Sequence, residues 1–215
     1  MEIGSGSHVL DIGSGLGGPA RTLAEEYGCR VTGIDLSAEF CDTARQLSRW
    51  VGLSDRVSFS QGDATALPYD AGSFNAVMTI HVAMNIAAKD ALYASARRVL
   101  KPGRIFAVYD ILQGEGGAVA YPVPWARDSS ISHLATPVEM RGLLESAGFR
   151  IEAEDDSTEA SEDWFKQAAA RMAEATSPPL SLRQFLGGDA VQMTKNQVRN
   201  LMERRIRTVT YICRG

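Results

Sequence analysis

The sequence predicts an α/β protein, a three-layer sandwich in which a mostly parallel sheet is covered by helices on both faces. Strand and helix patterns alternate five times between His8 and Leu112, which is typical of a parallel sheet built from crossover units. The strand segments, such as FNAVMTI at Phe74–Ile80, are nearly uninterrupted apolar runs. Such runs are expected for strands that are buried on both faces.

The first half of the chain supplies five strands and three helices. We expect the strands at His8–Ile12, Arg30–Ile34, Val57–Ser60, Phe74–Ile80 and Arg104–Leu112. We expect the helices at Pro19–Tyr27, from Ser37 to Val51 and at Asp90–Leu100. Gly28 is a stop signal for the first helix, and the Ser37 side chain is a cap for the second.

The second half of the chain is richer in helix. After the irregular segment Gln113–His133, the expected elements are a helix from Thr136 to Ala147, a strand at Phe149–Glu154, helices at Ala168–Ala175 and Val191–Arg205, and a last strand at Thr208–Cys213. We interpret the acidic stretch Glu152–Asp163 as a solvated loop and helix start, and Pro178-Pro179 as a helix break. Residues 155–205 are then a helical insertion in a single domain of residues 1–215.

The composition is that of an ordinary globular protein, with 45% hydrophobic and 22% charged residues. The net charge of −4 argues against a nucleic-acid partner. The three cysteines lack a metal-binding spacing, so we expect reduced thiols in a cytoplasmic protein and no metal site. No apolar run approaches the roughly 18 residues of a membrane span, so we expect no membrane partner. Four arginines are expected to form a solvated face that balances residues 152–163: Arg199, Arg204, Arg205 and Arg207.

The first strand runs into a glycine-rich turn with the sequence VLDIGSGLGG. Gly13, Gly15 and Gly18 match the pattern GxGxxG between a strand and a helix. This pattern gives a tight turn and a close approach of the backbone to a ligand at a helix N-terminus. Asp35 lies about 20 residues beyond the glycines, where a dinucleotide-binding protein holds its ribose.

Three features favour a ligand other than a dinucleotide. Asp11 places a carboxylate just before the turn, which suits an ammonium group better than a pyrophosphate. Asp63 ends the third strand with a further acid, which suits an adenine amino group. The segment TVTYIC at Thr208–Cys213 suits an antiparallel last strand better than a second mononucleotide-binding half.

Four stretches of the chain, VLDIGSGLGG, GIDLS, GDATALPYDAGSFNAV and LKPGR, together resemble the class I S-adenosylmethionine-dependent methyltransferases. The resemblance covers nearly the whole chain and implies a Rossmann-like, seven-stranded sheet with an antiparallel last strand. The stretches VAMNI, YPVPWA and TPVEMRGLLESAGF resemble the small-molecule branch that methylates ubiquinone precursors, sarcosine or dimethylglycine, and phosphoethanolamine. The family's usual N-terminal helices have no counterpart before His8, and the insertion is a candidate lid in their place.

The resemblance assigns the cofactor's methionine part to the glycine turn. It places this part of S-adenosyl-L-methionine, and of the product S-adenosyl-L-homocysteine, over Gly13, Ser14 and Gly15. Asp11 is then expected to orient the ammonium group, directly or through water.

The resemblance assigns the nucleoside part to the next two strand ends. Asp35 is expected to take both ribose hydroxyls, with Leu36 against the adenine edge. Asp63 is expected near the adenine amino group, with a backbone contact from Ala64. The alternative for each acid is a loop carboxylate that caps the next helix.

Five residues are candidates for the transferred methyl group and its acceptor. His81 is either a wall residue or base beside the methyl group, and so also a cofactor contact, or a loop histidine held by the backbone. Asn85 is expected to contact substrate. Tyr109 and Trp125 suit a cationic amine through cation–π contacts, or they pack a rigid loop. Asp110 binds a substrate amine or caps a loop.

A sulfonium methyl group is already activated, so in-line displacement by an N, O or C nucleophile mainly needs alignment. The sequence accordingly shows no strong catalytic constellation. We therefore predict methyl transfer to a small molecule, with the oligomeric state undetermined. The alternatives are a nicotinamide-dependent oxidoreductase that uses the same glycine turn and a cofactor-binding protein without transfer activity.

Overall fold

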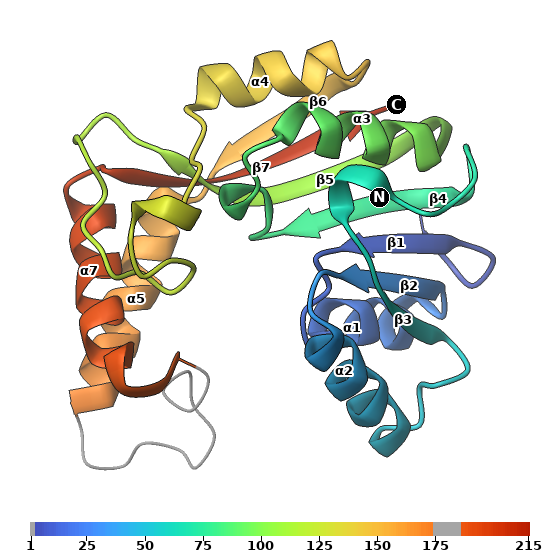
Figure 1. The fold of residues 1–215 in the computed structure, drawn as a ribbon, viewed down its shortest axis with the longest axis horizontal. Helices are drawn as coiled ribbons and strands as arrows, with labels where there is room; N and C mark the ends of the chain where they lie inside the picture. The colour runs from blue at the N-terminus through green and yellow to red at the C-terminus, as the bar shows by residue number, and fades with distance from the viewer. Residues whose placement is uncertain (1–2, 174–185) are drawn as a thin grey trace.

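The computed structural model describes residues 3–173 and 186–215, which contain one seven-stranded sheet in the order β3-β2-β1-β4-β5-β7-β6 (Figure 1). The strands are β1 His8–Ile12, β2 Arg30–Asp35, β3 Val57–Gln61, β4 Phe74–Ile80, β5 Leu100–Gln113, β6 Arg150–Asp156 and β7 Ile206–Arg214. The first five pair in parallel, and β7 runs antiparallel to both β5 and β6. The predicted Rossmann-like sheet with an antiparallel last strand is confirmed.

Helices cover both faces of this sheet. They are α1 Gly18–Tyr27, α2 Ala38–Trp50, α3 Lys89–Val99, α4 Pro137–Ser146, α5 Thr158–Ala173 and α7 Ala190–Met202. Figure 1 shows α3 and α4 on one face and the other four helices on the opposite face. On each face a separate cluster of buried apolar side chains joins the helices to the strands. Among the described helices, none combines the length and the hydropathy that a membrane span requires.

Two of the helices begin where the sequence predicts, each with a side-chain cap, of which Ser37 was predicted as a cap. The Ser37 hydroxyl accepts a hydrogen bond from the Phe40 amide at 3.1 Å, ahead of α2. Thr136 and Glu139 form a reciprocal capping box at the start of α4, with Pro137 in its first turn. These contacts satisfy amides that a helix N-terminus otherwise leaves without partners.

The acidic stretch at residues 152–163 departs from the prediction. It is not a loop, because β6 continues to Asp156 and α5 begins at Thr158, ten residues earlier than the expected helix. β6 is an edge strand, and its acids pair with arginines on neighbouring elements: Glu152 with Arg214, and Glu154 with Arg141. The strand predicted at Phe149–Glu154 therefore extends two residues further than expected, the predicted helix start is present at Thr158, and the predicted loop between them is wrong. The Pro178-Pro179 break lies outside the described residues.

The arginine face is neutralised by acids, as predicted. Arg207 pairs with Asp156, and Arg204 pairs with Glu162 of α5. Arg199 and Arg205 both contact Glu203 on the same surface. The three cysteines are buried and form no disulfide.

Candidate functional site

A cleft of about 590 Å³ opens at the carboxyl ends of β1 to β4. Parallel strands place their carboxyl ends on one edge of a sheet, which is where open α/β sheets bind ligands. Eight of the predicted site residues line the cleft: Gly13, Gly15, Asp35, Leu36, Asp63, Ala64, His81 and Asn85. The sequence therefore located the cleft correctly from four separate strand ends.

The glycine turn is held by the end of β2. The amides of Gly13 and Ser14 donate to the Ile34 carbonyl at 2.8 and 3.1 Å. Gly13 and Gly15 have φ values of +71° and +51°, in the left-handed region that favours glycine. A Cβ on Gly13 would lie 2.2 Å from the Val82 side chain, whereas one on Gly15 would meet nothing within 4 Å. Gly13 thus permits the close approach of the segment after β4, and Gly15 leaves space open.

Asp35 joins the turn to the start of α2 while retaining capacity for a ligand. One carboxylate oxygen accepts from the Gly15 amide at 2.8 Å, and the other accepts from the Ser37 amide at 3.0 Å. A carboxylate offers about four acceptor positions, so each oxygen can take one more donor. Two neighbouring hydroxyl groups would satisfy that capacity.

Two buried polar groups beside the turn have no hydrogen-bond partner. Asp11 is 2% exposed and its Oδ2 is unpaired, and Ser14 is 5% exposed with its Oγ unpaired. Burial, together with the nearby charge of Asp35, raises the pKa of Asp11 to about 7. Buried polar groups without partners are rare and costly. An ammonium group bound here would supply the missing donors and favour the charged carboxylate.

Asp63 both caps a turn and faces the cleft. Its Oδ1 accepts from the amide and the hydroxyl of Thr65, each at 2.8 Å, at the start of the short 3-10 helix η1, Ala64–Ala66. These hydrogen bonds lower the pKa of Asp63. Leu36 stands at the cleft with 73% of its surface exposed. The capping role and the ligand-facing role of Asp63 are thus compatible.

His81 lies where this cleft adjoins a second cavity of about 490 Å³. Its backbone is left-handed, with φ +55°, and its amide donates to the Tyr109 carbonyl at 2.8 Å. Its ring lies 4.5 Å from the Tyr109 ring, centroid to centroid. The surrounding protein lowers the pKa of His81 to about 4, although the side chain still reaches solvent. The imidazole is therefore neutral at pH 7.

The second cavity is largely apolar and lies between β5, α5 and α7. Its apolar lining comes from Tyr109, Pro124, Ala160, Trp164, Phe165 and Leu186. Of the described residues that line it, none carries a carboxylate, and the polar ones besides His81 are hydroxyl side chains. The sequence missed Trp164 and Phe165 because they follow the acidic stretch that we expected to be solvated. The feature of the sequence that could have indicated this cavity was the adjacent aromatic pair Trp164-Phe165.

Asp110 does not face either cavity. It is 1% exposed, and its two oxygens accept from the amides of Met84 at 3.0 Å and Ile111 at 2.9 Å. Of the two roles left open for Asp110, the structure shows the loop-capping one. The other role, contact with a substrate amine, is not supported because the carboxyl group is enclosed in the protein.

Trp125 is also a packing residue. Its indole Nε1 donates to the Ser132 hydroxyl at 3.0 Å, and its ring packs against a buried apolar cluster that includes Ile206. Its carbonyl accepts from the Asn85 amide nitrogen at 3.0 Å. Trp125 lines neither the cleft nor the second cavity. Of its two predicted roles, the structure therefore favours packing of a rigid loop over contact with substrate.

With this geometry in place, part of the chain matches a family of known proteins. Residues 9–103, which span the glycine turn and the first four strands, match the family model described as a methyltransferase domain. Residues 9–103 are therefore similar to a methyltransferase domain, in line with the resemblance to the class I S-adenosylmethionine-dependent methyltransferases.

The relatives of this chain are longer proteins. It is 32% identical over 162 residues to the sterol 24-C-methyltransferase of Eremothecium gossypii, an alignment that covers 72% of this chain and 43% of that protein. The chain spans less than half the length of that relative and of the sterol 24-C-methyltransferase ERG6B of Gibberella zeae, of which it covers 30%.

Two solved structures share the fold of this chain. The phosphoethanolamine N-methyltransferase 2 of Haemonchus contortus has a TM-score of 0.84 at 22% identity, covering 100% of this chain and 49% of that one. The (4+2)-cyclase SpnF has a TM-score of 0.78 at 25% identity, covering 100% of this chain and 76% of that one. The second neighbour illustrates that a shared fold does not by itself determine the reaction.

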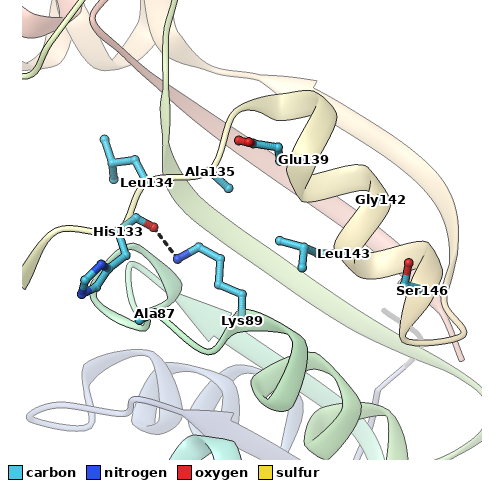
Figure 2. A pocket seen from close by; sticks show the side chains of 9 residues that line it. All are labelled: Ala87, Lys89, His133, Leu134, Ala135, Glu139, Gly142, Leu143 and Ser146. Carbon is cyan, nitrogen blue, oxygen red and sulfur yellow. Dashed lines mark hydrogen bonds between the residues drawn. The ribbon is translucent and has the colours of Figure 1, made fainter.

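Besides the cleft and the second cavity, a third hollow of about 560 Å³ lies between the start of α3 and α4 (Figure 2). Its two charged side chains are both engaged elsewhere. Glu139 accepts from Thr136 in the capping box at 2.7 and 2.8 Å, and Lys89 reaches toward the His133 carbonyl. All three donors of Lys89 are occupied, whereas Glu139 is exposed and uses only its Oε2 in the capping box.

Proposed function

We propose that this chain binds S-adenosyl-L-methionine in the cleft and transfers the methyl group to a small-molecule acceptor in the adjoining cavity. The observation that carries the proposal is the pair of unpartnered buried groups, Asp11 Oδ2 and Ser14 Oγ, beside an open glycine turn. This arrangement lacks an ammonium group, and a methionine moiety carries one. A pyrophosphate would place negative charge against Asp11, which disfavours a nicotinamide dinucleotide.

Asp35 and Asp63 line the cleft, whereas Asp11 and Ser14 are buried beside the glycine turn and do not line it. Each of the three carboxylates would hold a different part of the cofactor. The Asp11 carboxylate would accept from the ammonium group, and Asp35 would accept from two ribose hydroxyls. Asp63 and Leu36 would face the adenine at the other end of the cleft. The bound sulfonium supplies an activated methyl group, so the protein's main tasks are alignment and exclusion of water.

The second cavity supports an acceptor that is apolar around its reacting atom. Its lining is rich in aromatic and aliphatic side chains and, among the described residues, lacks a carboxylate that would attract an amine cation. We therefore prefer an uncharged acceptor to the cationic amine that the sequence suggested. The neutral His81 ring lies at the junction of both spaces, where a ring nitrogen can accept a proton from an acceptor hydroxyl or carbon acid.

The test is a calorimetric titration with S-adenosylhomocysteine and, separately, with NADH. We expect micromolar binding of the first and none of the second. Asp35→Ala should weaken S-adenosylhomocysteine binding about 10- to 100-fold, because a lost hydrogen bond to a charged group costs about 1.5–3 kcal/mol. Asp42→Ala, on the exposed surface of α2, is the matched control and should bind as the unaltered protein does. Preferential binding of NADH would overturn the proposal.

A further inference from the structure

The wall between the cleft and the second cavity is one short segment, residues 81–88. Six of its eight residues line the cleft: His81, Val82, Asn85, Ile86, Ala87 and Ala88. His81 also lines the second cavity. The only regular structure in the segment is the three-residue 3-10 helix η2, Ala83–Asn85. Its position must therefore be determined by contacts with other elements.

Lys89 holds this segment through three carbonyl groups. It is 6% exposed, and its ammonium donates to the carbonyls of Ala83 at 2.6 Å and Ile86 at 2.7 Å. The third donor goes to the carbonyl of His133, as Figure 2 shows. A lysine ammonium has three N–H donors, so all three are used. Two of them bind the segment, and one ties it to the chain before α4.

Asp110 holds the same segment through an amide. Its Oδ2 accepts from Met84, at the centre of η2, at 3.0 Å. Burial raises the pKa of Asp110 to about 7, and the positive charge of Lys89 acts in the opposite direction. In turn, burial lowers the pKa of Lys89 and the charge of Asp110 opposes that change. Each group thus favours the charged form of the other.

Lys89 and Asp110 influence each other through their charges without forming a salt bridge, and buried opposite charges are in general a poor way to stabilise a fold. Replacing such a pair with apolar side chains of similar volume is often neutral or stabilising, whereas removing one member leaves an uncompensated charge. The two residues instead fix the positions of particular backbone groups. Lys89 contacts only carbonyl oxygens, and Asp110 contacts only backbone amides, including those of Met84 and Ile111.

We propose that Lys89 and Asp110 are positioning residues that fix the wall segment, and with it His81, between the donor and acceptor spaces. The part of this inference that concerns methyl transfer rests on the proposed function. The part that concerns the position of the segment does not, and this difference lets the two be tested separately.

The experiment compares Lys89→Met, Asp110→Asn, the double variant and the unaltered protein. Lys195→Met is the control, because Lys195 is an exposed lysine of α7 outside the wall segment. Three quantities are measured: the melting temperature, the hydrogen-exchange rates of the Met84 and Ile86 amides without ligand, and the Kd for S-adenosylhomocysteine. Amides of β1 and β2 serve as the internal reference for exchange.

We expect each single variant to speed exchange of the Met84 and Ile86 amides more than tenfold relative to the reference amides, and to weaken S-adenosylhomocysteine binding three- to tenfold. The double variant should regain part of the melting temperature lost by Lys89→Met, because it no longer buries a lone charge. It should not regain slow exchange or tight binding. Lys195→Met should match the unaltered protein.

Two results would overturn the positioning role. One is unaltered exchange of the two amides in all variants. The other is recovery of exchange and Kd together with the melting temperature in the double variant, which is what a purely stabilising pair would give. Failure of the unaltered protein to bind S-adenosylhomocysteine would count against the proposed function instead, since the exchange measurement needs no ligand.

Discussion

At the scale of single residues, the site is marked by buried polar atoms that have no hydrogen-bond partner in the protein. Asp11, Ser14 and Asp35 were expected from their places in the sequence, and all three lie at the glycine turn. Sequence reasoning cannot show that Asp11 Oδ2 is buried without a partner, because that depends on which donors the folded chain leaves nearby. It also left Asp110 between two roles, since a carboxylate near a strand end looks the same whether it faces ligand or core.

Asp11 should make the stability of the ligand-free protein depend on pH. Its pKa is raised from 3.8 to about 7 in the folded state, so the folded state binds more protons than the unfolded chain between these values. The free energy of unfolding should therefore fall as the pH rises from 4 to 7. Relative to Asp11→Asn, the unaltered protein should lose about 2 kcal/mol between pH 5 and pH 8.

Urea unfolding of both proteins at pH 5 and pH 8 measures this difference, and only its change with pH is attributed to the carboxylate. The same Asp11→Asn variant should bind S-adenosylhomocysteine more weakly. A stability difference that is independent of pH would show that Asp11 keeps an ordinary pKa and is charged in the folded protein throughout this range.

At the scale of elements, apolar strands and capped helices were the easiest to predict. β1 and β4 begin and end at the expected residues, α2 starts after the predicted cap Ser37, and α4 starts after Thr136, the predicted helix start. In the stretch 152–163 the predicted loop was wrong, because β6 continues to Asp156 with its acids paired to β7 and α4, and α5 begins directly afterwards at Thr158. That error also hid Trp164 and Phe165, so most of the acceptor cavity could not be predicted.

Trp164 belongs to α5 and should matter for the acceptor but not for the cofactor. It lines only the second of the two cavities and is 49% exposed. With an apolar acceptor found by screening for transfer of a labelled methyl group, Trp164→Ala should lower kcat/KM more than tenfold. Its Kd for S-adenosylhomocysteine should stay within about twofold, since a change confined to the acceptor leaves cofactor contacts intact.

Trp50→Ala is the matched control, because Trp50 is an exposed tryptophan at the end of α2, away from both cavities. A screen that yields only cationic amines as acceptors would contradict the apolar assignment of this cavity.

At the scale of the whole molecule, two spaces meet at one histidine. The parallel half of the sheet provides the cleft, while α5 and α7, inserted between β6 and β7, provide most of the apolar cavity. Alternation of strands and helices is enough to predict the first, because parallel strands must share a carboxyl edge. The second cavity depends on how α5 and α7 pack against β5, which cannot be predicted from the sequence. That residues 155–205 act as a lid, within a single domain of residues 1–215, stays a prediction.

The measurement that tests the central claim most directly is a crystal structure of this protein with S-adenosylhomocysteine. We expect the amino group to lie beside Asp11 and Ser14, the ribose hydroxyls on Asp35, and the sulfur to be directed toward His81 and the second cavity. A ligand bound elsewhere, or one whose sulfur points away from His81, would contradict the claim that the two spaces together form a methyl-transfer site.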